Sequence, residues 1–153
     1  GPWAYLEHSV ADLNVIQEQP RKGVHDFWDT VGPVFGDSPQ TVHRQPSVQV
    51  PDGFYRLVTA LDPATGRLQV LPLYLDHDLP HNRPIRLREM VTTVEDLENK
   101  TGLRFFPWLS DDVRVSVRTR PADPRFWDLD RWIWFGEGGS RVEARQADEW
   151  RVP

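Results

Sequence analysis

Two apolar segments and the polar turn between them decide the fold: Phe54–Leu61 (FYRLVTAL), Asp62–Arg67 (DPATGR) and Leu68–Leu75 (LQVLPLYL). Apolar and aromatic runs of this length, separated by Asp, Pro and Gly, predict the two antiparallel strands of a β-hairpin. Because apolar residues are nearly continuous in both runs, we expect both strands to be central and covered on both faces. Pro72 has no backbone N–H and indicates an edge or a bulge at its position.

Three further segments place another strand and two helices around this hairpin. Thr30–Phe35 (TVGPVF) is a short apolar run that predicts a strand over part of its length. Pro2–Ile16 carries apolar residues at helical spacing and predicts an amphipathic helix. Thr92–Glu95 matches a capping box, and Gly102 suits a left-handed helix end, so we expect a helix at about 93–101. The sequence therefore predicts an α+β fold, with an antiparallel or mixed sheet flanked by helices.

The composition is that of an acidic domain of ordinary size. The 153 residues include 18 Lys and Arg against 23 Asp and Glu, a net charge of -5, and 39% of them are hydrophobic. The sequence has no cysteine, which excludes disulfides, a thiolate zinc site and a cysteine nucleophile. No apolar run approaches the roughly 20 residues that span a bilayer, and no signal peptide is visible. We expect a soluble protein with no membrane partner, and the compartment stays open.

Two acidic clusters are candidates for chemistry, and each has a plainer interpretation. Asp76–Asp78 (DHD) with His81 offers carboxylate and imidazole ligands for a divalent metal, or forms a solvated loop after a strand. Asp111–Asp112 offers a carboxylate pair for acid–base catalysis, or begins a turn or a helix beside Ser110. We favour the plainer interpretation of both clusters.

A Trp-rich extension at residues 121–153 follows a domain that ends near Arg120. Its aromatic residues and arginines can stack the bases of a single-stranded nucleic acid, at about 1–3 kcal/mol per base, or pack the extension onto the domain. Asp128 and Asp130 oppose a phosphate backbone, so we favour packing. The aromatic residues and arginines concerned are Trp127, Trp132, Trp134, Phe135, Arg125 and Arg131.

Four segments, in order along the chain, resemble one family. They are Gly1–Glu7 (GPWAYLE), Thr30–Phe35, Phe54–Val58 (FYRLV) and Val91–Pro107 (VTTVEDLENKTGLRFFP). Together they are similar to the DNA/RNA non-specific endonucleases, which include the mitochondrial endonuclease G type and secreted bacterial nucleases with a ββα-metal active site. The similarity covers roughly residues 1–120. It implies that this region is the C-terminal portion of a ββα-metal nuclease fold.

The resemblance also implies a chemistry and a site residue. Family members are Mg²⁺-dependent phosphodiesterases, in which an Asp-Arg-Gly-His motif supplies a general-base histidine and an asparagine holds the metal. That asparagine lies just before the segment that matches Gly1–Glu7, and this chain contains neither motif. The family's acidic residue on the following helix matches Glu7, which would hold water on Mg²⁺ or Mn²⁺ or serve near the leaving group. The alternative is that Glu7 is a solvated helix residue.

None of the chain's five histidines lies in a motif that matches the family's histidine motif, so the resemblance assigns none of them as the base. They are His8, His25, His43, His77 and His81.

The leading hypothesis is that the chain is the C-terminal half of a sugar-non-specific nuclease for DNA and RNA. An N-terminal half with the Asp-Arg-Gly-His motif would then be its partner, either cleaved or separate, and a homodimer is possible. The alternative is a binding or regulatory module that keeps the nuclease scaffold without catalysis. The net charge of -5 opposes phosphate binding, although Arg83, Arg86 and Arg88 can dominate locally.

Overall fold

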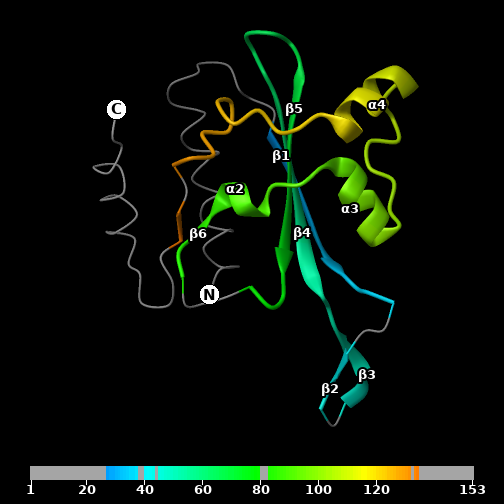
Figure 1. Ribbon diagram of the computed structural model, residues 1–153. Coiled ribbons are helices and arrows are strands. Elements are labelled where there is room, and N and C mark those ends of the chain that lie inside the picture. Colours follow the sequence, from blue (N-terminus) through cyan, green and yellow to red (C-terminus); the bar gives the residue numbers. More distant parts are fainter. Residues whose placement is uncertain (1–26, 38–39, 44, 80–82, 132, 135–153) are drawn as a thin grey trace.

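The hairpin predicted from residues 54–75 is present in the computed structural model, which describes residues 27–37, 40–43, 45–79, 83–131 and 133–134. Strands β4 (Gly53–Leu61) and β5 (Leu68–Asp76) pair antiparallel along their whole length. Strand β1 (Phe27–Val34) pairs antiparallel with the other edge of β4, which gives the strand order β1-β4-β5. This sheet with its helices confirms the α+β class (Figure 1).

The turn between β4 and β5 is held by the side chain of Asp62. Its Oδ1 accepts a hydrogen bond from the backbone N–H of Ala64, and its Oδ2 accepts one from the Thr65 hydroxyl, both at 2.9 Å. Gly66 takes a φ of 65°, a left-handed conformation in which glycine pays no side-chain penalty. The Asp, Thr and Gly of this segment therefore form the turn that the sequence predicts.

Two details of the sheet differ from the sequence prediction. In the described sheet β4 is central but β5 is an outer strand, so the prediction that both hairpin strands are central is wrong for β5. The edge indicated by Pro72 is present there, where its carbonyl accepts the Thr92 N–H at 3.0 Å and Leu73 forms a single bridge to Val91. Strand β1 includes most of the Thr30–Phe35 run, but it begins at Phe27 and ends before Phe35.

Both faces of the β4–β5 hairpin are covered, as its continuous apolar pattern predicts. Helices α3 (Val94–Thr101) and α4 (Asp111–Thr119) lie on one face. Strand β6 (Ile85–Arg86), helix α2 (Leu87–Met90) and residues 122–129 lie on the other (Figure 1). The core therefore consists of two clusters separated by the sheet. The first contains Val34, Tyr55, Leu57, Val70, Val94, Leu97, Phe105, Phe106 and Val117, and the second contains Val58, Ala60, Leu71, Leu73, Leu75, Ile85, Leu87, Met90, Ala122, Phe126, Trp127 and Leu129.

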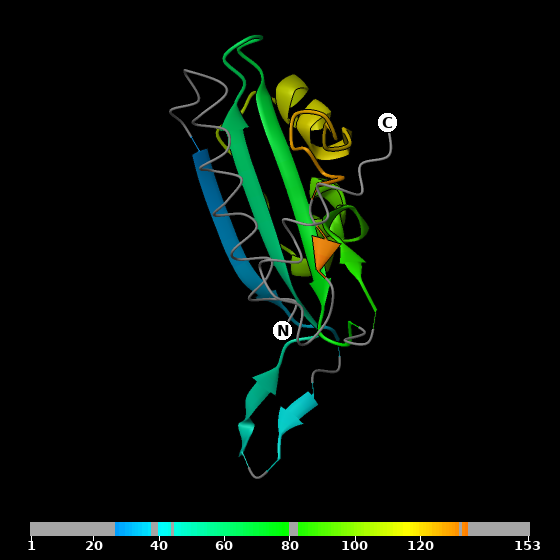
Figure 2. The same cartoon turned by 90° about the vertical axis from the view of Figure 1, so that its left-hand side faces the viewer.

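Two small two-stranded ladders complete the described residues. Strands β2 (Gln40–Val42) and β3 (Gln45–Val50) form a ribbon that projects beyond the end of the main sheet (Figures 1 and 2). Strand β7 (Ile133–Trp134) pairs with β6 and so joins the extension to the domain. The helix predicted at Pro2–Ile16 lies outside the described residues. Among the helices that the structure describes, none has the length and apolar character needed to cross a membrane.

Helix α3 confirms the predicted helix, with a one-residue correction at its start. The N-cap is Thr93, whose hydroxyl accepts the Asp96 N–H at 3.1 Å, rather than Thr92 with Glu95. Thr92 instead donates its hydroxyl to the Asp96 carboxylate at 2.7 Å. At the other end Gly102, with a φ of 70°, closes the helix in the left-handed conformation as predicted.

Glu98 connects the two helices on this face of the sheet. Its side chain is 8% exposed and pairs with Arg114 at 2.7 Å and with Arg118 at 2.6 Å, and it also accepts the Phe105 N–H at 2.9 Å. Burial alone raises the pKa of Glu98, but the hydrogen bond from Phe105 and the two arginines outweigh burial and lower it. Glu98 therefore stays ionised and holds α4 against α3.

We predict that Glu98→Gln destabilises the chain by about 2–3 kcal/mol, because two partly buried guanidinium groups lose their counter-charge. Glu95→Gln is the matched control. Glu95 is 46% exposed and pairs with Arg118 at 3.2 Å, so its loss should cost less than about 1 kcal/mol. The folded pKa of Glu98 lies below its unfolded value, so its contribution is full above about pH 5 and is lost as the pH falls. Urea unfolding across the acidic range measures both effects. Equal losses for the two variants would contradict the prediction.

Candidate functional site

The catalytic candidate of the sequence analysis lies outside the described residues. Glu7 belongs to residues 1–26, as do His8 and His25, and His81 belongs to residues 80–82. The two other histidines, His43 and His77, are exposed. Among the described residues, no group of three or more His, Cys, Asp or Glu could hold a metal ion. Glu7 therefore stays a prediction, and no metal site is placed by the residues that the structure describes.

Asp76–Asp78 forms a turn at the end of β5. The Asp76 Oδ1 accepts the Asp78 N–H at 2.8 Å, and the His77 N–H donates to the Asp52 carbonyl at 2.8 Å. All three side chains are exposed. This is the loop interpretation of the segment, and its combination with His81 is a prediction that the described residues do not test.

Asp111 and Asp112 begin a helix, as the plainer interpretation predicts. They occupy the first turn of α4, with Ser110 at the N-cap position. Hydrogen bonds from the Ser110 side chain, and then from the backbone N–H groups of Asp112 and Val113, lower the pKa of Asp112. A carboxyl that acts as a general acid near neutral pH needs the opposite change, a raised pKa. The geometry is therefore that of a helix terminus.

The Trp-rich segment is part of the core where the structure describes it. Trp127 is fully buried, and Phe126 packs edge-on against it with ring centroids 4.9 Å apart. A buried indole cannot stack an incoming base, so the packing interpretation holds for these two residues. Trp132 and Phe135 lie outside the described residues, and Trp134 is described only through its place in β7.

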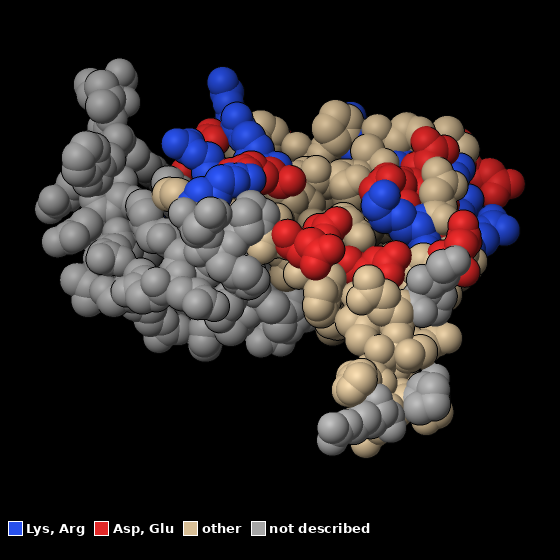
Figure 3. Space-filling model, turned by 60° about the horizontal axis from the view of Figure 1, so that its bottom comes forward, with Lys and Arg blue, Asp and Glu red and all other residues tan. Residues whose placement is uncertain are grey.

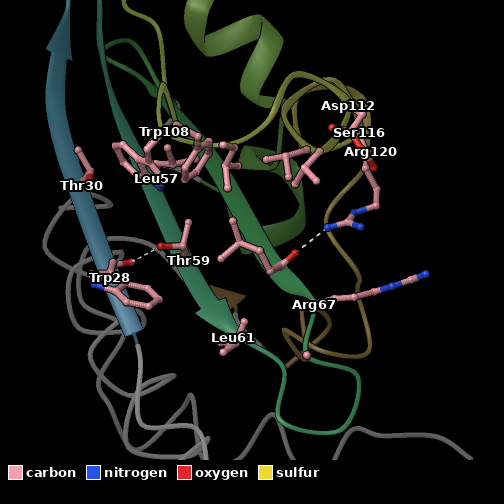
Figure 4. A pocket seen from close by; sticks show the side chains of 16 residues that line it. Trp28, Thr30, Leu57, Thr59, Leu61, Arg67, Trp108, Asp112, Ser116 and Arg120 are labelled. Atoms are coloured by element: carbon pink, nitrogen blue, oxygen red, sulfur yellow. Dashed lines mark hydrogen bonds between the residues drawn. The ribbon is translucent and has the colours of Figure 1, made fainter.

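A large apolar groove lies on the sheet face that α4 only partly covers. Its volume is about 1100 Å³, and we call it the Trp28–Trp108 groove after its two most exposed aromatic residues. Trp28 is 52% exposed and Trp108 is 77% exposed. Figure 4 shows Trp28, Thr30 and Leu57 on the sheet below Trp108. The remaining lining residues are Thr59, Leu61, Gly66, Arg67, Leu68, Phe106, Leu109, Asp112, Val113, Ser116, Val117 and Arg120.

Local structure explains why these side chains reach the groove. Trp28 and Thr30 alternate along β1 and share the face that carries Leu57 and Thr59 on β4. The Thr59 hydroxyl donates to the Trp28 carbonyl at 3.4 Å, which links β4 to β1 at the floor of the groove. Arg120, which follows α4, donates to the Leu68 carbonyl at 2.6 Å and so holds the end of α4 to β5. The lining is mainly apolar, which is the character of a surface that binds another apolar surface. The sequence analysis did not predict this groove. The alternation of side chains along β1 could have indicated that Trp28 lies on the same face of the sheet as Thr30.

The described residues define an α+β protein whose antiparallel sheet carries helices on both faces and leaves an apolar groove beside one edge strand. A model of the DNA/RNA non-specific endonuclease family matches residues 1–112, and the chain therefore belongs to that family. No curated protein matches the chain. Membership of this family supports a nuclease function, and family members typically depend on a divalent metal.

We predict that Trp108→Ala changes the free energy of unfolding by less than about 1 kcal/mol, because most of the Trp108 side chain is already in water. Trp127→Ala is the matched control and should cost about 4 kcal/mol, since it leaves a cavity in a fully buried position. Denaturant unfolding monitored by circular dichroism measures both values. A loss of several kcal/mol for Trp108→Ala would show that this residue is part of the core.

Proposed function

We propose that the chain is the C-terminal part of a Mg²⁺-dependent, sugar-non-specific endonuclease that hydrolyses phosphodiester bonds in DNA and RNA. The family match over residues 1–112 is the observation that carries this proposal. The ββα-metal active site is part of the proposal, since it follows from the family and not from the described residues. Mn²⁺ is an alternative ion.

Glu7 is the residue of this chain that we propose to act on the metal. It lies inside the matched region, and the resemblance implies that it takes the place of the family's acidic helix residue. A carboxylate suits a hard divalent ion that keeps several of its waters. When bound, such an ion neutralises charge on the scissile phosphate and lowers the pKa of coordinated water. The role of Glu7 is to accept hydrogen bonds from water molecules that are bound to the ion, which holds them in place.

The general-base histidine and the metal-binding asparagine would come from an N-terminal segment, on a separate or a cleaved chain, that carries Asp-Arg-Gly-His. The surface of β1 supports a contact with such a segment. Trp28 and Val31 are each 52% exposed and lie on opposite faces of β1, which is the outer strand of the described sheet. The only charge along this strand, Asp29, is paired with Arg56. An added strand would cover both apolar side chains without burying an unpaired charge.

A second candidate function is a binding or regulatory module that keeps the nuclease scaffold without catalysis. The Trp28–Trp108 groove favours it, because exposed tryptophans in an apolar groove are typical anchors for a protein partner. The two candidates differ in whether the protein cleaves nucleic acid at all.

For the nuclease, we predict that the product of the complete open reading frame linearises or degrades a plasmid with Mg²⁺ and stops when a chelator is added. Glu7→Gln should lower the cleavage rate about 100-fold, because a neutral amide oxygen is a weaker acceptor for the water on the ion than a charged carboxylate. Glu95→Gln is the control, since Glu95 is exposed, pairs with Arg118 and has no proposed catalytic role. Full activity of Glu7→Gln would remove Glu7 from the site, and no cleavage by the wild-type protein would favour the binding module.

For the partner contact, we predict that Val31→Lys weakens the association of this chain with the Asp-Arg-Gly-His segment about tenfold or more. Burial of the valine side chain in the contact would contribute about 1.5–3 kcal/mol, and the lysine replaces this contribution with a charge. Val115→Lys is the matched control, because Val115 is 56% exposed on α4 and lies away from β1. Titration calorimetry measures both affinities. Equal effects of the two substitutions would contradict a contact at β1.

A further inference from the structure

Three arginines lie close together on the face of the sheet opposite the Trp28–Trp108 groove. Arg83 precedes β6, Arg86 ends β6 and Arg88 lies on α2. All three are exposed, with 48% of the Arg83 side chain and 53% of the Arg88 side chain in contact with solvent. We call them the Arg83–Arg88 cluster. In Figure 3 Lys and Arg side chains gather as a blue group, with red between them, beside the grey part of the surface.

Neighbouring carboxylates hold the cluster in place. Glu89 accepts the Arg86 backbone N–H at 3.0 Å and pairs with Arg83 at 2.8 Å, while Arg83 also donates to the Pro84 carbonyl at 3.0 Å. The hydrogen bond from the Arg86 backbone, and then that from the Arg83 side chain, lower the pKa of Glu89, so its charge persists. These contacts fix the segment before α2 and leave much of each guanidinium exposed.

The cluster keeps a positive charge after its ion pairs are counted. Arg88 pairs with Asp130 at 2.9 Å, and Arg83 pairs with Glu89. In the described part of the chain, the Arg86 guanidinium has no carboxylate within ion-pair distance. With three guanidinium groups and the two carboxylates Glu89 and Asp130, the described part of the cluster carries a net positive charge.

Several other arginines of the described residues are paired with carboxylates or stand alone in loops. Arg114 and Arg118 are occupied by Glu98 on the groove side of the sheet. Arg67 lies in the β4–β5 turn and Arg104 lies in the segment after α3, so each stands in a separate loop. The Arg83–Arg88 cluster therefore offers several guanidinium groups within a few residues, the arrangement that suits adjacent phosphates.

We propose that the Arg83–Arg88 cluster binds the sugar-phosphate backbone of a nucleic acid strand. This inference rests on the proposed nuclease function, which supplies a polyanionic substrate, and adds a contact surface to it. Guanidinium contacts with phosphate carry no base readout, so the surface binds DNA and RNA without regard to sequence. It offers a nuclease a way to hold its substrate that does not depend on the catalytic residues.

The test compares two double variants with equal changes in net charge. Arg86→Gln/Arg88→Gln removes two cations from the cluster, and Lys100→Gln/Arg104→Gln removes two exposed cations at the end of α3, on the other side of the sheet. Binding is measured with the chain as it is, in chelator to prevent cleavage, by anisotropy of a fluorescein-labelled duplex of about 20 base pairs at several salt concentrations. Circular dichroism checks that every variant is folded.

We expect the cluster variant to bind about tenfold more weakly at about 0.1 M salt, and the slope of log K against log salt to fall by about 2, since each lost phosphate contact removes about 0.9. The control variant should stay within about twofold of wild type, because its cations are not in the contact. A single-stranded RNA of equal length should show the same difference. The inference is overturned if the wild-type chain does not bind, or if the two variants bind alike.

Three further outcomes distinguish this inference from general anion binding and from the proposed nuclease function. If vesicles of phosphatidylserine displace the duplex at equal phosphate concentration, the cluster is a general anion surface and the nucleic-acid assignment fails. If the complete protein cleaves plasmid while the cluster variant binds as tightly as wild type, the nuclease function stands and the Arg83–Arg88 surface does not. Weaker binding by the cluster variant in a protein that never cleaves would support the surface and contradict the nuclease.

Discussion

The structure depends on covering both faces of the β4–β5 hairpin. Leu57 is 3% exposed and the next residue, Val58, is fully buried, although their side chains point to opposite faces of the sheet. A strand with such neighbours is stable only if each face has its own cover, because either side left open would expose large apolar side chains to water. Helices α3 and α4 supply one cover, and α2 with residues 122–129 supplies the other.

This requirement explains which elements could be predicted from the sequence. The hairpin and α3 have local signals, namely apolar runs, a turn and caps, and both were predicted to within a few residues. For α4 only a turn or helix start at Asp111–Asp112 was predicted, and not the helix that follows, because Val113, Val115 and Val117 alternate as in a strand and are β-branched. What makes it helical is tertiary: Arg114 and Arg118 reach Glu98 on α3, a contact between residues far apart in the sequence.

The sequence indicated a candidate site residue only through the ordered segments that resemble the family. The family was recognised from segments along the chain, and Glu7 followed from the family and not from any local property of that residue. Exposure of individual tryptophans could not be predicted, because Trp127 and Trp108 both lie in aromatic segments rich in proline. Trp127 is buried since its segment covers a sheet face, whereas Trp108 lies over a part of the other face that α4 leaves open.

The acidic net charge and a nucleic acid substrate are compatible because charge acts locally. At about 0.1 M salt the Debye length is about 10 Å, so distant carboxylates are largely screened while cations at the contact are not. The balance of charge differs from one part of the described surface to another. Burial and then Asp76, Asp52 and Asp96 raise the pKa of the Tyr74 hydroxyl, which shows a concentration of negative charge near the end of β5. The proposed contact with a phosphate backbone at the Arg83–Arg88 cluster lies away from these carboxylates. The arrangement of charge, and not its sum, therefore decides where a strand can approach this protein.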